Sequence, residues 1–259
     1  MSYSPRAVLQ PFLDRLLTRS ILTDVEQQAI LSLPTSHMFV RANQEFVREH
    51  EKTAFCCLIV SGLVGRIGLT RKGKRQITAF HIPGDMADLH SAVRPVGIGG
   101  LTAMTDTAIL RVPHDAVRRI AAKHPAIAEA FWCDCMVDAA ILMEWILNIG
   151  QRNATARLAH IFCEMSLRHG RDREMLDYEF AVTQEQLGDA TGITGVHANR
   201  SLKSLREQGL VTLKGGRVTI TDWGKLAKVG EFDPYYLAGD TTGERQRRLL
   251  VTNVSGRRP

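Results

Sequence analysis

Apolar and polar residues alternate in short runs along the first half of the chain, between positions 38 and 112. The runs span residues 54–60, 63–69, 76–82 and 107–112. Turn signals such as Ser61-Gly62 and Pro83-Gly84-Asp85 end them. Alternation of period two is typical of a strand with one buried face, and short strands at regular spacing favour an antiparallel barrel or sandwich. A stretch of helical pattern over residues 11–31 precedes this β region.

The pattern changes at Pro125, where apolar residues recur at helical spacing as far as residue 149. The apolar stripe of this helix consists of Ile127, Ala130, Phe131, Val137, Ile141 and Trp145. A second copy of the chain, related by a twofold axis, would cover such a stripe. The alternative is a helix that packs only on its own β domain. We predict a homodimer held together by Ile127, Ala130, Val137, Ile141 and Trp145.

Residues 183–203 have the pattern of two short helices joined by a tight turn. Thr183 is a good N-cap with Gln186 three residues later, and Gly192 can end the first helix in a left-handed conformation. Thr194 can cap the second helix. The buried stripe of that helix is Ala198, Leu202 and Leu205, and its opposite face carries Val196, Asn199, Arg200 and Lys203. A short helix, a glycine turn and a helix exposing Asn, Arg and Lys indicate a helix-turn-helix that enters a DNA major groove. The alternative is an ordinary two-helix hairpin with a solvated face.

Residues 210–220 favour the DNA-binding interpretation. Two alternating runs meet at Gly215-Gly216, which is the signal of a β-hairpin whose turn tolerates positive φ. A helix-turn-helix followed directly by such a hairpin is a winged helix. Lys214 and Arg217 flank the tip of the wing and are placed to reach phosphates, although basic residues at a turn are often only solvated.

The charge of the chain agrees with a DNA ligand without requiring one. The 259 residues carry a net charge of +6, spread along the chain with a mild bias toward residues 151–230. A protein that contacts a few phosphates per subunit needs no larger excess. A second basic cluster, at residues 71–75, is open to two interpretations: a nucleic-acid patch or an exposed hairpin turn. The pattern favours the turn.

Composition also bears on the location of the protein. No apolar run approaches the length of a membrane span, and the first residues lack the basic-then-apolar pattern of a signal sequence. The five cysteines include no pair at the CxxC spacing of zinc sites. We expect a cytoplasmic protein with reduced thiols.

Taken in order, a β domain, a long helix and a winged helix-turn-helix resemble the Crp/Fnr family of bacterial transcription regulators. The similarity covers about residues 10–230, and its strongest stretches are residues 157–164, 182–187 and 192–202. It implies an α+β fold with an antiparallel β-roll similar to cyclic-nucleotide-binding domains. The implied division is a β-roll sensor at 1–124, a dimerisation helix at 125–150, the DNA-binding domain at 151–230 and a tail at 231–259. A further implied partner is RNA polymerase.

The resemblance assigns roles to residues of the helix-turn-helix. Thr183 and Thr194 fall where family members contact phosphates, and Arg200 falls on the arginine that reads guanine through a bidentate bond. Val196 stands where many members have a glutamate, so the operator is expected to differ at that position. The predicted DNA-binding residues are Thr183, Thr194, Gly195, Val196, His197, Asn199, Arg200, Lys203, Lys214 and Arg217.

The sensor departs from the pattern of the members that bind cyclic AMP. Asp88 and Leu89 stand where those members have a Gly-Glu pair for the ribose, and glycines at 97–100 replace the Arg-Ser pair for the phosphate. Leucine accepts no bond from a hydroxyl, and an aspartate would repel the phosphate. We expect no response to cyclic AMP at physiological concentration and leave the effector unknown. The predicted pocket residues are Gly84, Asp85, Asp88, Leu89 and Arg94.

Other sensing chemistries also lack parts, and no cofactor or metal is predicted. Iron–sulfur members draw most ligands from an N-terminal cysteine group, whereas Cys56 is the first cysteine here. A haem ligand among His81, His90 and His114 is less expected than a satisfied core or solvated histidine. Cys133 and Cys135 project about 200° apart on one helix and would not pair with each other.

Two competing functions are weaker. A cupin-like metal enzyme needs a His-x-His motif, which does not occur in the chain. A ligand-binding signalling protein that has lost DNA binding is disfavoured by Arg200 and by the wing. We therefore predict a DNA-binding regulator and not an enzyme. The polar residues 238–259 have the composition of a flexible tail.

Overall fold

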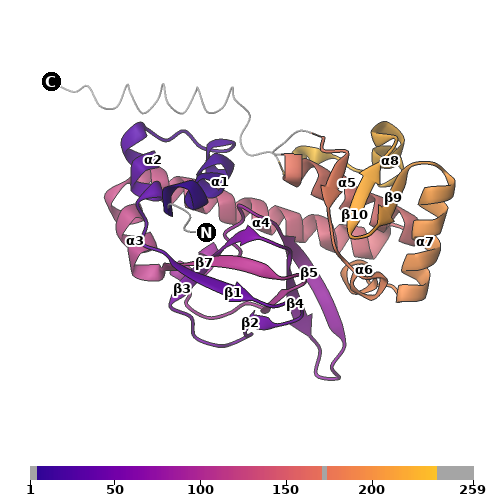
Figure 1. The fold of residues 1–259 in the computed structure, drawn as a ribbon, viewed down its shortest axis with the longest axis horizontal. Coiled ribbons are helices and arrows are strands. Elements are labelled where there is room, and N and C mark those ends of the chain that lie inside the picture. The colour runs from indigo at the N-terminus through magenta and orange to yellow at the C-terminus, as the bar shows by residue number, and fades with distance from the viewer. Residues whose placement is uncertain (1–4, 171–173, 238–259) are drawn as a thin grey trace.

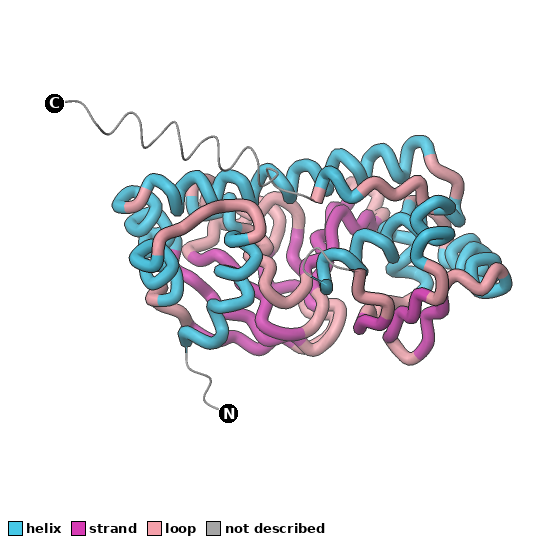
Figure 2. Tube along the Cα trace, turned by 90° about the horizontal axis from the view of Figure 1, so that it is seen from above, coloured by secondary structure: helices cyan, strands magenta, loops and turns pink. Residues whose placement is uncertain are grey.

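The computed structural model describes residues 5–170 and 174–237 (Figure 1). It has the expected α+β fold, with a β-roll at one end, a long helix along the molecule and a winged helix at the other end. Figure 2 shows the strands in two separate groups, one in the roll and one in the wing. Residues 238–259, predicted to form a flexible tail, lie outside the described residues.

The β-roll consists of two antiparallel sheets preceded by two helices, α1 (Pro5–Leu17) and α2 (Asp24–Leu31). The first sheet has the order β1-β7-β3, from Ser36–Val40, Thr107–Pro113 and Phe55–Ser61. The second has the order β2-β6-β4-β5, from Glu45–Val47, Gly100–Ala103, Val64–Leu69 and Arg75–His81. The four runs of alternating residues correspond to β3, β4, β5 and β7. A 3-10 turn η1 (Leu89–Ala92) and helix α3 (His114–Lys123) complete the roll.

Helix α4 (Pro125–Gln151) runs the length of the molecule between the roll and the winged helix (Figure 1). The stripe predicted for dimerisation faces inward: Ile127 and Ala130 join the core beneath α1, while Val137, Ile141 and Trp145 join the core shared with the winged helix. The assignment of these residues to a dimer interface is therefore wrong. The helix carries two apolar faces, and periodicity does not indicate which one the chain's own domains cover.

The other face of α4 is exposed. Its large apolar side chains are Trp132, Met136, Leu142, Met143, Ile146 and Leu147. Trp132, Met143 and Ile146 each expose about seven-tenths of their surface (70%, 71% and 71%). None of the helices in the described part of the chain has the length and apolar composition needed to cross a bilayer.

The winged helix begins with α5 (Ala154–Gly170) and contains the two predicted helices α6 (Gln184–Thr191) and α7 (Gly195–Glu207). Its sheet has the order β8-β10-β9, so the predicted hairpin β9 (Val211–Lys214) and β10 (Arg217–Ile220) has a third strand, β8 (Asp177–Glu179). Helix α8 (Trp223–Val229) and a 3-10 turn η2 (Pro234–Tyr236) follow. The segment predicted as a tail from residue 231 is folded up to Leu237, which is buried.

One continuous core joins the roll to the winged helix. Phe80 on β5 packs edge-on against Trp145 of α4 and against Phe180, with ring centroids 5.7 and 5.0 Å apart. Phe180 lies immediately before the helix-turn-helix. Phe80 therefore packs β5 directly against both α4 and the DNA-binding unit.

Candidate DNA-binding surface and sensor cavity

Helix α7 presents its polar face at the surface of the molecule, as the sequence predicted. Thr194 caps its first turn, with the side-chain oxygen accepting from the backbone N–H of His197. A shallow groove runs over the first turns of α6 and α7. Its lining residues are Gln184, Glu185, Thr194, Gly195, Val196, Asn199 and Arg200.

Two residues that the sequence analysis did not single out hold the two helices together. A Cβ on Gly188 would lie 2.6 Å from the carbonyl oxygen of Ile193, so only glycine allows this close crossing of α6 and the turn. Arg157 on α5 donates to the carbonyl oxygens of Arg152 and Thr191, each at 2.8 Å. The second bond satisfies an end carbonyl of α6 and fixes α6 to α5.

The predicted DNA-contacting side chains differ in how free they are. Asn199 donates to Gln184 across the groove at 2.9 Å, and Lys203 lies 3.6 Å from Glu207. Val196 exposes 65% of its surface. Within the described residues, the exposed Arg200 makes no hydrogen bond or ion pair. A ligand can therefore bind the guanidinium of Arg200 without breaking a bond within the protein, whereas Asn199 and Lys203 already have partners.

The wing differs from the prediction in one respect. Lys214 is exposed at the tip, but Arg217 forms an ion pair with Asp177 and lies 3.8 Å from Glu179 on β8. These carboxylates compensate its charge. The sequence did not indicate this, because β8 lies forty residues before Arg217 and was not predicted.

A cavity of about 220 Å³ lies between β4, β5 and α4. Its lining combines apolar side chains with Arg66, His81, His90, Asp138 and Arg168. The Nε2 atoms of both histidines are buried and have no hydrogen-bond partner. Burial, reinforced by Arg66, holds the pKa of His81 well below its usual range and lowers the pKa of His90 to about 4. Both imidazoles are neutral at physiological pH, so each offers one donor and one acceptor.

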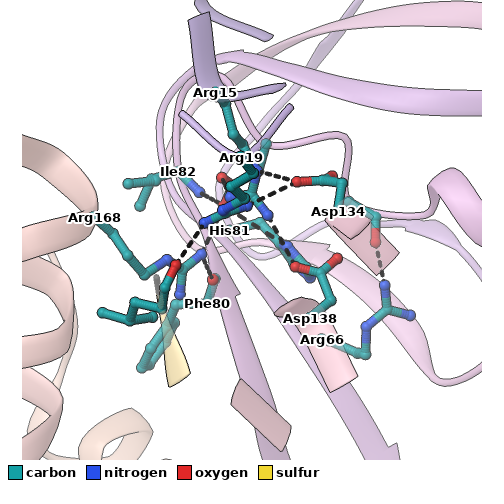
Figure 3. Close-up of polar contacts among 12 residues, drawn as sticks. Arg15, Arg19, Arg66, Phe80, His81, Ile82, Asp134, Asp138 and Arg168 are labelled. Atoms are coloured by element: carbon teal, nitrogen blue, oxygen red, sulfur yellow. Dashed lines mark hydrogen bonds and ion pairs between the residues drawn. The ribbon is translucent and has the colours of Figure 1, made fainter. Parts of the chain in front are cut away.

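A network of buried ion pairs borders the cavity and connects three parts of the chain (Figure 3). Arg15 of α1 donates to Asp134 at 2.7 Å, to Asp138 at 3.0 Å and also to Asp85. Arg168 of α5 donates to Asp85 at 2.7 Å and to the carbonyl oxygen of Phe80 at 2.8 Å. Burial alone would raise the pKa of Asp85, but Arg15 and Arg168 hold it well below its ordinary value. Asp85 is therefore ionised and ties the roll to the DNA-binding unit.

The residues predicted for the effector pocket do not line this cavity. Gly84 and Asp85 border a smaller cleft beside α1. Asp88 is buried, where it accepts a bond from the backbone N–H of Cys57 at 2.6 Å, and burial raises its pKa to about 6. Leu89 is buried and Arg94 is exposed. The cavity is built from elements that are distant in sequence, whereas these five residues follow a single turn, so the effector pocket assigned to them stays a prediction.

Both parts of the chain are similar to known protein domains. Residues 156–229 match the Crp-like helix-turn-helix domain, and residues 37–124 match the cyclic nucleotide-binding domain. The chain is 26% identical to the nitrogen fixation regulation protein FixK of Azorhizobium caulinodans, over 73% of this chain and 76% of that protein. It is 25% identical to the regulatory protein HlyX of Actinobacillus pleuropneumoniae, over 65% and 70%. The structure of FixK2 from Bradyrhizobium japonicum superposes with a TM-score of 0.69, at 24% identity, over 76% of this chain and 98% of that one.

The chain belongs to the Crp/Fnr family. It is a DNA-binding transcription regulator of this type, and its relatives are transcription regulators rather than enzymes. The β-roll of this Crp/Fnr regulator is its cyclic nucleotide-binding-type domain, and α6 and α7 are the two helices of its Crp-like helix-turn-helix domain.

The two arginines that line the cavity of this Crp/Fnr regulator already have hydrogen-bond partners. Arg66 is committed to the carbonyl oxygens of Ile98 and Ala87, and Arg168 to Asp85 and Phe80. A cyclic phosphate entering the cavity would therefore displace existing bonds to gain a cation. Asp138 lies on the same wall. An unneutralised phosphate charge in such a site costs several kcal/mol.

Metal and redox chemistry receive no support from the site geometry. Across residues 5–170 and 174–237, no group of three or more His, Cys, Asp or Glu side chains is arranged to hold a metal ion. His114 bonds to Ser91 at 2.8 Å and lies outside the cavity lining. All five cysteines are free, and burial with the neighbouring Asp134 raises the pKa of Cys135 to about 12. A thiol of this kind is protonated and unreactive at neutral pH.

Proposed function

We propose that the protein binds inverted-repeat promoter DNA as a homodimer, in the cytoplasm, with Arg200 reading a guanine in each half-site. The exposed face of α7 is the observation that carries this proposal: Arg200 is exposed and has no partner among the described residues, while the rest of the helix-turn-helix is held by caps and core packing. Thr183, Thr194 and Lys214 would contact phosphates, and Val196 would touch a thymine methyl. Any effect on transcription would then pass through RNA polymerase, and no catalytic step is involved.

The exposed face of α4 supports the dimer. Trp132, Met136, Ala139, Met143 and Ile146 are spaced alternately by four and three residues, which is the heptad pattern of a coiled-coil seam. A patch of large apolar side chains on a soluble domain is typical of an interaction site. The division of labour would be a sensor roll at 1–124, dimerisation at 125–150 and DNA binding at 151–230.

Selection of binding sequences from a pool of random duplexes tests this function. The recovered sites are expected to be inverted repeats whose half-sites lie about 34 Å apart, the distance between successive major grooves on one side of the duplex. Each half-site should contain an invariant guanine. Recovery of single half-sites without symmetry would contradict the homodimer, and recovery of no preferred sequence would contradict specific recognition.

We also predict that cyclic AMP and cyclic GMP bind no tighter than the millimolar range. Members that bind cyclic AMP hold its phosphate with a cation and its ribose with a hydrogen-bond acceptor. Loss of each contact costs about 1.5–3 kcal/mol of binding free energy, and the two losses together weaken a micromolar ligand to the millimolar range. Isothermal titration calorimetry measures this directly. Binding tighter than about ten micromolar would mean that Arg66 or Arg168 exchanges its present partners for the phosphate.

A further inference from the structure

The β4–β5 hairpin carries a concentrated positive charge at its tip. Arg71, Lys72 and Lys74 lie between the two strands with no acidic residue among positions 70–76, and all three are exposed. The structure assigns none of the three a hydrogen bond or ion pair through its side chain within the described residues. The turn itself is held by Thr70 and Lys74. The N–H of Thr70 donates to the carbonyl oxygen of Lys74 at 2.9 Å, the N–H of Lys74 donates to the Thr70 hydroxyl at 3.1 Å, and Gly73 has a φ of +73°. The three side chains are therefore not needed to form the turn.

The same hairpin is attached to the helix-turn-helix. Arg75, at the start of β5, donates to Asp189 of α6 at 2.6 Å and lies 3.5 Å from Glu185. Gln76 donates to the carbonyl oxygen of Ala190 at 3.4 Å. Glu185 also lines the groove beside the recognition helix. In Figure 1 the hairpin projects from the roll next to α6. Its tip is thus held at a fixed place relative to the DNA-binding surface.

The charges divide into two groups with different uses. Arg75 is compensated by the two carboxylates of α6, so it fastens the hairpin and offers little to a ligand. The three basic residues of the tip have no acidic partner among the described residues. Lys and Arg side chains beside a DNA-binding helix bind DNA phosphates. The duplex carries one phosphate charge per about 1.7 Å of its axis, and these charges attract cations over a Debye length. Bases are read by α7, so contacts elsewhere would fall on the backbone of neighbouring DNA.

We propose that the tip of the β4–β5 hairpin binds the phosphate backbone of the DNA that flanks each half-site. The inference rests on the proposed function, because the tip can meet flanking DNA only when α7 occupies the major groove. It gives the sensor domain a direct part in DNA binding. DNA that bends toward the roll would gain these contacts, so flanking sequences that bend easily would be favoured without being read.

The test compares Lys72→Gln/Lys74→Gln with a matched pair, Lys52→Gln/Lys123→Gln. Lys123 is the last residue of α3. Lys52 lies three residues before Phe55, which pairs with Pro113 directly before α3. Both control lysines therefore lie at the end of the roll near α3. Affinity is measured on the selected site alone and on the same site extended by about 10 base pairs at each end. Both full-length variants carry the same charge.

The tip variant is expected to bind the short duplex like wild type and the extended duplex about 10- to 100-fold more weakly. On the extended duplex, its slope of log affinity against log salt should fall by up to about 3.6, since each of the four phosphate contacts in a dimer accounts for about 0.9. The control pair should change neither quantity.

Three results would overturn the proposal. The tip and control variants could weaken binding equally, which would show a general charge effect. The tip variant could bind the extended duplex as wild type does. It could also keep full affinity while losing transcription with RNA polymerase, which would assign the tip to a protein partner. Failure of the proposed function itself is distinct, because wild-type protein would then fail to bind the short duplex specifically.

Discussion

Replacing Arg200 by alanine should weaken binding to the selected site by about 1–3 kcal/mol per half-site, which is about 5- to 150-fold. The preference for one guanine in each half-site should relax at the same time. The reason is geometric: a guanidinium donates two parallel bonds to O6 and N7 of guanine, and no other base presents two acceptors in that arrangement. Titration of duplexes carrying each of the four bases at that position measures the effect.

Arg206→Ala provides the matched control for this experiment. Arg206 lies on the same helix, is exposed and carries the same charge, but it is six residues further on and points away from the face of Arg200. It should alter base preference little. If Arg200→Ala kept the preference of wild type, the register of α7 in the groove would differ from the one proposed here.

The double substitution Met143→Glu/Ile146→Glu should produce a monomer and reduce affinity for the full site by about 10²- to 10⁴-fold. Each side chain is 71% exposed within one chain, so charge at these positions leaves the core of the protomer intact. Across a twofold seam, four carboxylates would be buried against each other, which is strongly unfavourable. A monomer binds only one half-site, so it loses the gain in affinity that comes from binding two linked half-sites at once, and such gains are about 10²- to 10⁴-fold. Sedimentation velocity and duplex titration measure the two effects.

Val25→Glu on α2 serves as the control. Val25 is 68% exposed and apolar like the two targets, but it lies on a different helix, α2, outside the proposed seam of α4. The variant should remain dimeric and bind DNA normally. A Met143→Glu/Ile146→Glu protein that still sediments as a dimer would show that copies of this chain associate through another surface.

Elements with local signals were predicted correctly from the order of residues alone. Thr183, Gly192 and Thr194 define the ends of two helices through their own caps and turn geometry, and the structure confirms all three. Alternation of apolar residues located four strands of the roll for the same reason. The helix-turn-helix and its exposed face were therefore predictable, since every interaction that defines them lies within about twenty residues of sequence.

The contacts between elements became known only from the folded chain. Two apolar stripes on α4 look alike in sequence, and the packing of α1, β5 and α5 determines that Val137 and Trp145 are inside while Met143 and Ile146 are outside. The cavity, the partner of Arg217 and the attachment of Arg75 to α6 depend on residues 40 to 114 positions apart. Periodicity reports which side chains share a face of one element. It carries no information on which other element covers that face, because that depends on how the whole chain minimises its exposed apolar area and its unpaired buried charges.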